Sequence, residues 1–168
     1  MINNYLNFVS KKRSQIILFI LFNLCGLIFI LLPYGIVWNM LDLHFSYTSA
    51  DVFKSFYQMG EKGRYVNLYS TLIIDTAYPI LYTSLLLGAL NNLFKNKKFF
   101  FLPITIFILD ISENINIAYM NTTFLNLNET QVMIASTITS SKWITIFVTL
   151  SLLIFGLLKT KLLSQTSV

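Results

Sequence analysis

Residues 99–120, FFFLPITIFILDISENINIAYM, form an apolar stretch with two carboxylates, Asp110 and Glu113, in its second half. At about 1.5 Å per residue, a helix of this length crosses the hydrocarbon core of a bilayer. An acid at the centre of a membrane helix costs about 2.5 to 3.5 kcal/mol, whereas each Leu, Ile or Phe returns only about 0.3 to 0.6 kcal/mol. Such a helix is marginal alone, so we expect other helices to pack against it and shield the two acids.

The composition of the whole chain is that of an integral membrane protein. Of its 168 residues, 55% are hydrophobic and 11% are charged, and the mean hydropathy is +0.67. The net charge of +5 does not indicate nucleic-acid binding, because the basic residues are scattered between apolar blocks. The single cysteine, Cys25, excludes an intramolecular disulfide, and the single histidine, His44, excludes a zinc site built on histidines. The sequence therefore predicts no metal site and identifies no cofactor.

Three further apolar segments complete a predicted all-α, four-helix transmembrane bundle. The predicted spans cover about residues 16–37, 66–90, 99–120 and 143–158. They leave outer loops at 38–65 and 121–142 and an inner loop at 91–98, within a single transmembrane domain of residues 1–168. Pro33 is expected to kink the end of the first span.

A short amphipathic helix is predicted in the first outer loop. The segment Ser49-Ala-Asp51 can cap its start and Gly60 can end it. Four apolar residues fall on one side of it: Val52, Phe53, Phe56 and Tyr57. We expect this helix to lie on the surface and to cover the mouth of the bundle.

The distribution of basic residues predicts the orientation. Placing both termini and the 91–98 turn on one side collects eight basic residues there: Lys11, Lys12, Arg13, Lys95, Lys97, Lys98, Lys159 and Lys161. The other side has four: Lys54, Lys62, Arg64 and Lys142. The positive-inside rule then places the N- and C-termini in the cytoplasm.

Polar residues within the spans are predicted to face one another. Asp110, Glu113 and Asn114 share one helix face, since they are separated by three and four residues. On the second span, a stripe at helical spacing carries Thr71, Asp75, Tyr78 and Tyr82. Counted from the outer ends of two antiparallel helices, Asp75, Asp110 and Glu113 come out at about the same depth. We therefore expect three carboxylates to meet in the outer half of the bundle.

Three carboxylates in a low-dielectric pocket cannot all be ionised without counter-charge. We expect a shared proton, a bound cation or the ammonium group of a ligand, and Arg64 and Lys142 are the candidate counter-charges from the protein. The alternative is that the acids only hold the helices together. Hydrogen bonds between membrane helices are worth about 0.6 kcal/mol on average, which explains three buried acids poorly. Ionisable residues inside a membrane more often mark a functional site.

The same residues carry a resemblance to a known group. The segment Gly60-Glu-Lys-Gly63-Arg64 is followed by Tyr69, Asp75, Pro79 and Tyr82, then by Pro103, Asp110, Glu113 and Asn114, and finally by Lys142-Trp143. This order resembles a group of small bacterial four-span membrane proteins with the motifs "GR…D…P..Y" and "P…D..EN", whose activity is not established. The resemblance implies a multi-pass protein of the bacterial inner (plasma) membrane and supports the choice of site residues, but it implies no reaction. More loosely, four spans with buried acids look like the sterol-isomerase and sigma-2-type receptor class, with no motif that aligns.

The leading hypothesis is a polytopic membrane protein whose carboxylate cluster binds or transports a cation, a proton or an amine-bearing small molecule. Its predicted ligand- or ion-binding residues are Asp75, Asp110, Glu113, Asn114, Tyr78, Tyr82, Arg64 and Lys142. Two alternatives stay open: an intramembrane acid–base enzyme acting on a lipid or isoprenoid-like substrate, with no catalytic residue assigned, and an accessory subunit of a membrane complex. The expected partners are the lipid bilayer and a small cationic or lipid ligand, without nucleic acid. A homodimer that builds the pathway between protomers also stays open, because four helices leave little interior room.

Overall fold

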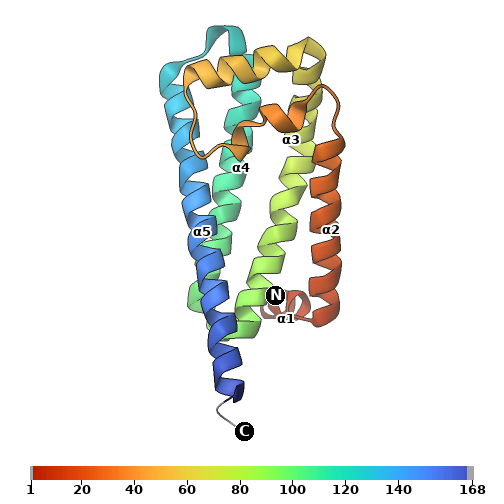
Figure 1. Ribbon diagram of the computed structural model, residues 1–168, viewed down its shortest axis with the longest axis vertical. Coiled ribbons are helices and arrows are strands. Elements are labelled where there is room, and N and C mark those ends of the chain that lie inside the picture. Colours follow the sequence, from red (N-terminus) through yellow and green to blue (C-terminus); the bar gives the residue numbers. More distant parts are fainter. Residues whose placement is uncertain (1, 166–168) are drawn as a thin grey trace.

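The computed structural model describes residues 2–165, with side chains described for residues 2–161, and within this range the chain is helical and contains no strand. The α-helices are α1 (Ile2–Val9), α2 (Lys12–Leu31), α3 (Ser49–Phe94), α4 (Phe101–Thr122) and α5 (Glu129–Gln165). Short 3₁₀ helices join them: η1 (Ile36–Asn39), η2 (Leu41–Leu43), η3 (Lys97–Phe100) and η4 (Phe124–Asn126). The helices α2 to α5 run along the long axis of the molecule (Figure 1) and are long and apolar enough to cross a membrane. The predicted all-α membrane bundle is therefore confirmed.

The first span ends earlier than predicted. Helix α2 stops at Leu31 because Leu32, the residue before Pro33, adopts an extended conformation. Pro33 thus terminates the helix and does not merely kink it. Tyr34 and Gly35 follow with positive φ angles of 64° and 65°, and the chain turns sharply into η1 and η2. We call residues 32–48 the re-entrant segment, because Figure 1 shows them turning back at the end of α2 and crossing the bundle below the first part of α3 towards α5.

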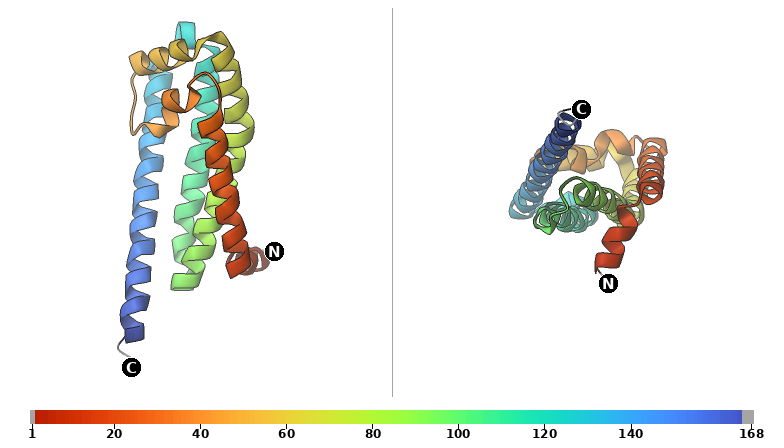
Figure 2. Two further views of the ribbon diagram at one scale, coloured as in Figure 1. Left: turned by 45° about the vertical axis from the view of Figure 1, so that its right-hand side comes forward. Right: turned by 90° about the horizontal axis from the view of Figure 1, so that it is seen from below.

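The short helix predicted over residues 49–60 is present as the first part of α3. Thr48 caps it, since its side chain accepts a hydrogen bond from the Asp51 N–H while the Asp51 carboxylate accepts one from the Thr48 N–H. At Gly60, with φ 65° and ψ 178°, the helix is interrupted and the chain turns into the bundle. In Figures 1 and 2 this part of α3 lies across one end of the bundle, which we call the capped end.

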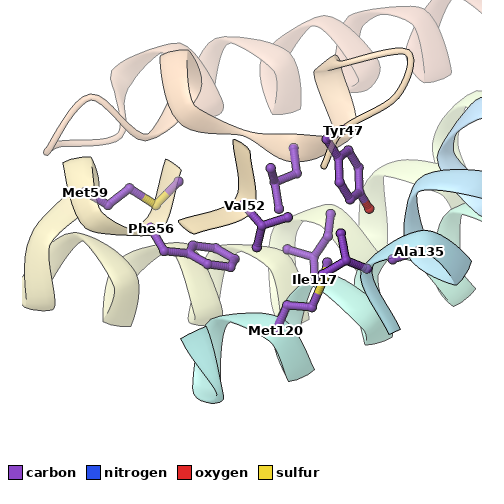
Figure 3. Packing of buried hydrophobic residues seen from close by; sticks show 9 residues of the cluster. Tyr47, Val52, Phe56, Met59, Ile117, Met120 and Ala135 are labelled. Atoms are coloured by element: carbon purple, nitrogen blue, oxygen red, sulfur yellow. The ribbon is translucent and has the colours of Figure 1, made fainter. Parts of the chain in front are cut away.

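Burial along this short helix corrects one detail of the prediction. Val52 and Phe56 are buried, whereas Phe53 and Tyr57 are exposed and stack on each other. The buried pair belongs to a cluster that joins the re-entrant segment, α3, α4 and α5 (Figure 3), with members Leu41, Tyr47, Val52, Phe56, Met59, Ile117, Met120, Val132 and Ala135. Burial of such side chains contributes about 1.5 to 3 kcal/mol each, so this cluster fixes the cap on the bundle.

Helix α5 begins at Glu129 and not at residue 143, so most of the predicted outer loop 121–142 is helical. Its Ser and Thr hydroxyls bond to carbonyls one turn earlier, as Thr137 does to Met133 and Ser141 to Thr137 at 2.8 Å each. These bonds satisfy the hydroxyls within the helix. Lys142 consequently lies about 20 Å along α5 from Glu129, inside the bundle and not at the end of a span.

Helix α1 was not expected, and it packs against α3 and α2 near the end of the bundle opposite the cap. Leu6 and Val9 are buried there. A side chain at Gly88 of α3 would collide with the Val9 carbonyl and the Gln15 amide, so only glycine allows this close approach. The Gln15 amide donates to the Val9 carbonyl at 2.7 Å and to the Leu85 carbonyl at 3.3 Å. These contacts hold α1 and the start of α2 against α3.

Candidate functional site

An ion-pair triad lies at the centre of the bundle. The Lys142 ammonium of α5 lies 2.9 Å from Oδ1 of Asp110 and also donates to Oε2 of Glu113, both on α4. All three residues are at least 95% buried. A lysine and two carboxylates at this depth require one another, because removing one partner would leave an uncompensated charge in a low-dielectric environment.

The remaining oxygens of the triad are also bonded. The Tyr82 hydroxyl donates to Oδ2 of Asp110 at 2.8 Å, and the Thr139 hydroxyl donates to Oε1 of Glu113 at 2.5 Å. The Tyr47 hydroxyl lies 3.3 Å from that of Thr139, and burial raises the pKa of Tyr47 to about 12, so it remains protonated. Each carboxylate oxygen of the triad therefore has a partner within the protein.

Asp75, on the facing side of α3, differs from the triad. Only 5% of the residue is exposed, yet its carboxylate has no hydrogen-bond donor and no cation partner among the described residues. It opens instead onto a cavity within the bundle that is open on one side. A buried carboxylate without a partner is costly, so its presence calls for an explanation.

Asn114 supports the backbone of Asp75 and does not contact its carboxylate. Its Nδ2 donates to the backbone carbonyl of Asp75 at 2.8 Å. Within a regular helix that carbonyl would accept from the residue four positions later, but this residue is Pro79, which has no N–H. The Asn114 amide thus replaces the bond that Pro79 removes and ties α4 to the turn of α3 that carries Asp75.

A fourth carboxylate, Asp42, reaches the same region from the re-entrant segment. Its backbone carbonyl accepts a hydrogen bond of 3.0 Å from Nε1 of Trp143, and its side chain lines the cavity. Burial raises the pKa of Asp42, the nearby Lys142 ammonium opposes this shift, and Asp110 adds to it. Non-helical backbone at membrane depth is tolerated where it lines a cavity, which is the position of this segment.

The cavity has a volume of about 650 Å³ and lies between α2, α3, α5 and the re-entrant segment. Its charged groups gather in one part, where it is lined by Asp42, Asp75, Asp110, Lys142, Tyr78 and Tyr82, whereas Gln15 lines it near Leu85. Tyr78 is held by ring contacts with Phe22, at 4.8 Å between centroids, and with Tyr82, at 5.7 Å. The rest of the wall is mainly apolar, with residues such as Phe19, Leu85, Leu86, Ala89, Ile146 and Leu150.

The structure brings seven of the eight predicted site residues together. Asp75, Asp110, Lys142, Tyr78 and Tyr82 line the cavity, whereas Glu113 and Asn114 lie behind its wall as partners of the triad and of the Asp75 backbone. Arg64 is elsewhere: its guanidinium stacks on Phe124 at 3.9 Å, beside a separate cavity of about 430 Å³ at the capped end. Lys142 therefore provides the counter-charge within the cluster.

Asp42 was not among the predicted site residues, because it fell within the predicted outer loop 38–65. A signal was present, since six of the eight residues from Ile36 to Leu43, after the turn at Pro33 and Gly35, are apolar. An apolar segment that follows a helix-ending turn is too short to span a bilayer and fits a re-entrant segment better than a loop.

Comparison with known proteins gives no relative: no family model matches the sequence, and no match was found among curated proteins or among solved structures. The resemblance to the bacterial four-span group stays a prediction. The function must be inferred from the geometry of the cluster and its cavity.

Proposed function

We propose that this membrane protein binds an amine-bearing small molecule, whose ammonium group lies between Asp75 and Asp42 in the cavity. The observation that carries the proposal is the Asp75 carboxylate, which is buried, unpartnered and open to the cavity. The cluster has four carboxylates for the one ammonium of Lys142, and the triad already uses that ammonium. A ligand cation would supply the missing positive charge.

The chemistry of the cavity favours an organic cation over a metal ion. In the described part of the chain, no group of three or more His, Cys, Asp or Glu side chains is arranged to hold a metal. The wall around the carboxylates is apolar and aromatic, with Phe22, Tyr78 and Trp143 close by. Such walls suit a molecule that combines a charged group with an apolar body.

The residues then divide by role. Asp75 and Asp42 accept hydrogen bonds from the ligand ammonium, and the Tyr78 hydroxyl is available as a further polar contact. The triad and Asn114 hold the wall in place. Because a single chain contains this cavity, the proposal does not need a homodimer. We further propose that the basic residues orient both termini to the cytoplasm of a bacterial inner membrane, which places the cap outside.

The proposal is tested by ligand-induced stabilisation of the purified protein in mild detergent. A ligand at a hundred times its Kd stabilises the folded state by about 2.7 kcal/mol. We expect phenethylamine to raise the unfolding temperature in a saturable manner, whereas phenethyl alcohol, which has the same ring and no charge, does not. The Asp75→Asn variant should fold and lose this response.

Thr71→Val is the matched control, since Thr71 is buried one turn away on α3 and does not line the cavity. It should respond to phenethylamine as the wild type does. An equal response of the Asp75→Asn variant, or an equal effect of the alcohol, would refute an ammonium site at Asp75.

The same cavity supports a second candidate function, an acid–base enzyme acting on a lipid. Asp110 forms an ion pair with Lys142, whereas the neighbouring Asp75 has no partner among the described residues. Carboxylates in such different environments can serve as acid and base. This candidate predicts that cells lacking the protein accumulate a lipid that the wild-type gene removes and the Asp75→Asn gene does not. An unchanged lipid profile would count against it.

A further inference from the structure

We infer that the ligand is a single-chain lipid amine, which enters the cavity sideways from the bilayer between α2 and α5. This inference rests on the proposed function for the ammonium end. It adds the nature of the apolar part of the ligand and its route.

The cavity is open towards the lipid between two helices. Both α2 and α5 contribute to its wall, yet along the described residues α2 packs mainly on α3 and has no extensive contact with α5. Figure 2, viewed along the bundle axis, shows them on separate sides of the bundle. The lining residues at this edge are apolar and exposed, with 59% for Phe19, 63% for Ile30 and 47% for Leu150. A rim of this composition faces hydrocarbon and not water.

The capped end of the bundle is covered, and at the opposite end α1 and α2 are tied to α3. At the capped end, Ile36 and Leu41 of the re-entrant segment are buried, and Val52 and Phe56 of α3 lie over the bundle (Figure 3). At the opposite end, α1 packs against α3 at Gly88 and the Gln15 amide bonds across the gap. The lateral opening is thus the route that the geometry favours.

The shape of the cavity points to a single chain. From Asp75, the wall continues along α3 through Leu85 and Leu86 to Ala89, fourteen residues away, which corresponds to about 21 Å of helix. The cavity is therefore elongated along α3, with the carboxylates in one part and mainly apolar side chains, together with Gln15, in the other. An extended chain with a terminal ammonium matches both properties.

Trp143 provides a direct probe of this arrangement, because it lines the cavity and bonds to the backbone of Asp42. The other tryptophan, Trp38, is 84% exposed, so Trp38→Phe leaves Trp143 as the sole tryptophan, whose emission can be excited selectively over that of the tyrosines. The protein would be placed in phosphatidylcholine nanodiscs and titrated with dodecylamine carrying bromine, a quencher, either close to the amino group or on the terminal carbon. Dodecanol with the same two substitutions is the control.

We expect saturable quenching of Trp143 by the amine brominated close to the amino group, reversed by unbrominated dodecylamine. The terminally brominated amine should quench less, because its bromine lies farther from Trp143, towards Leu86, and the alcohols should show no saturation. Equal quenching by both amines would refute the orientation of the chain. Non-saturable quenching by both would refute the binding of a single-chain amine.

Filling the far end of the cavity tests the chain separately from the ammonium site. Ala89→Phe should weaken hexadecylamine binding about tenfold, because an overpacking cost of about 1.4 kcal/mol corresponds to that factor, and should leave butylamine binding unchanged. Leu86→Phe serves as a second variant with the same expectation, in case the first does not fold. If both fold and neither alters the chain-length preference, the inference fails. The proposed function would still stand if phenethylamine binding depends on Asp75.

Discussion

Replacing Lys142 by methionine should destabilise the protein far more than loss of a surface ion pair would. The side chain of methionine has similar length, so the change mainly removes the positive charge. Asp110 and Glu113 would then remain buried, at 5% and 0% exposure. Both would lose the ammonium that now lies 2.9 Å from Asp110 and donates a hydrogen bond to Glu113. Breaking a buried pair in this way costs about 3 to 5 kcal/mol, which shifts the unfolding equilibrium by about two to four orders of magnitude.

The origin of this loss can be separated from a simple packing defect. If uncompensated charge is the cause, neutralising both acids as well, in the triple variant Lys142→Met, Asp110→Asn and Glu113→Gln, should restore most of the stability. The assay is reversible unfolding in mixed micelles, followed by the loss of helical signal as the fraction of denaturing detergent rises. A single variant within about 1 kcal/mol of the wild type, as expected of an exposed pair, would refute the buried triad.

Three further predictions concern the surroundings of the cavity. Asn114→Ala should lower the free energy of unfolding by about 1 to 3 kcal/mol, because it leaves the Asp75 carbonyl without a hydrogen bond. The loss should be smaller in a Pro79→Ala background, where a helical N–H can replace the bond. Equal losses in both backgrounds, measured in a double-mutant cycle, would contradict this role. Gly88→Val should displace α1, so hydrogen exchange should accelerate in residues 2–9 and not in α4; unchanged protection there would show that the close approach is unimportant. Because burial raises the pKa of Asp42, its ionised form destabilises the fold above the ordinary pKa of an aspartate. Asp42→Asn should therefore unfold at a higher temperature than the wild type at about pH 8, with the difference shrinking as the solution is acidified; a difference independent of pH would contradict it.

The architecture could be predicted from the sequence because the bilayer imposes a simple rule on length and polarity. The ends of the helices could not. Hydropathy places the start of the last span near residue 143, since the preceding residues are Ser and Thr, yet these side chains bond to their own helix and allow it to begin at Glu129. For the same reason, Lys142 was predicted at a membrane surface and lies inside the bundle.

The cluster on α3 and α4 was predictable because periodicity alone puts Asp110, Glu113 and Asn114 on one face and Asp75 at a matching depth. The distinct roles of these residues were not, because they depend on partners from other elements. Lys142 satisfies two of the acids and leaves Asp75 alone, while Asn114 compensates for Pro79. Asp42 joins them only through the path of the re-entrant segment, which no local pattern specifies.

The proposed function depends on the unpartnered Asp75 carboxylate holding the ammonium of a ligand. Native mass spectrometry of the protein released from mild detergent can detect such a ligand directly. The wild type, the Asp75→Asn variant and the Thr71→Val control would be purified from the same cells and compared. We expect the wild type and the control to carry a bound mass of amine-containing composition. A folded Asp75→Asn protein should lack this mass. The same bound mass on the Asp75→Asn protein, or failure of this variant to fold while the control does, would contradict it.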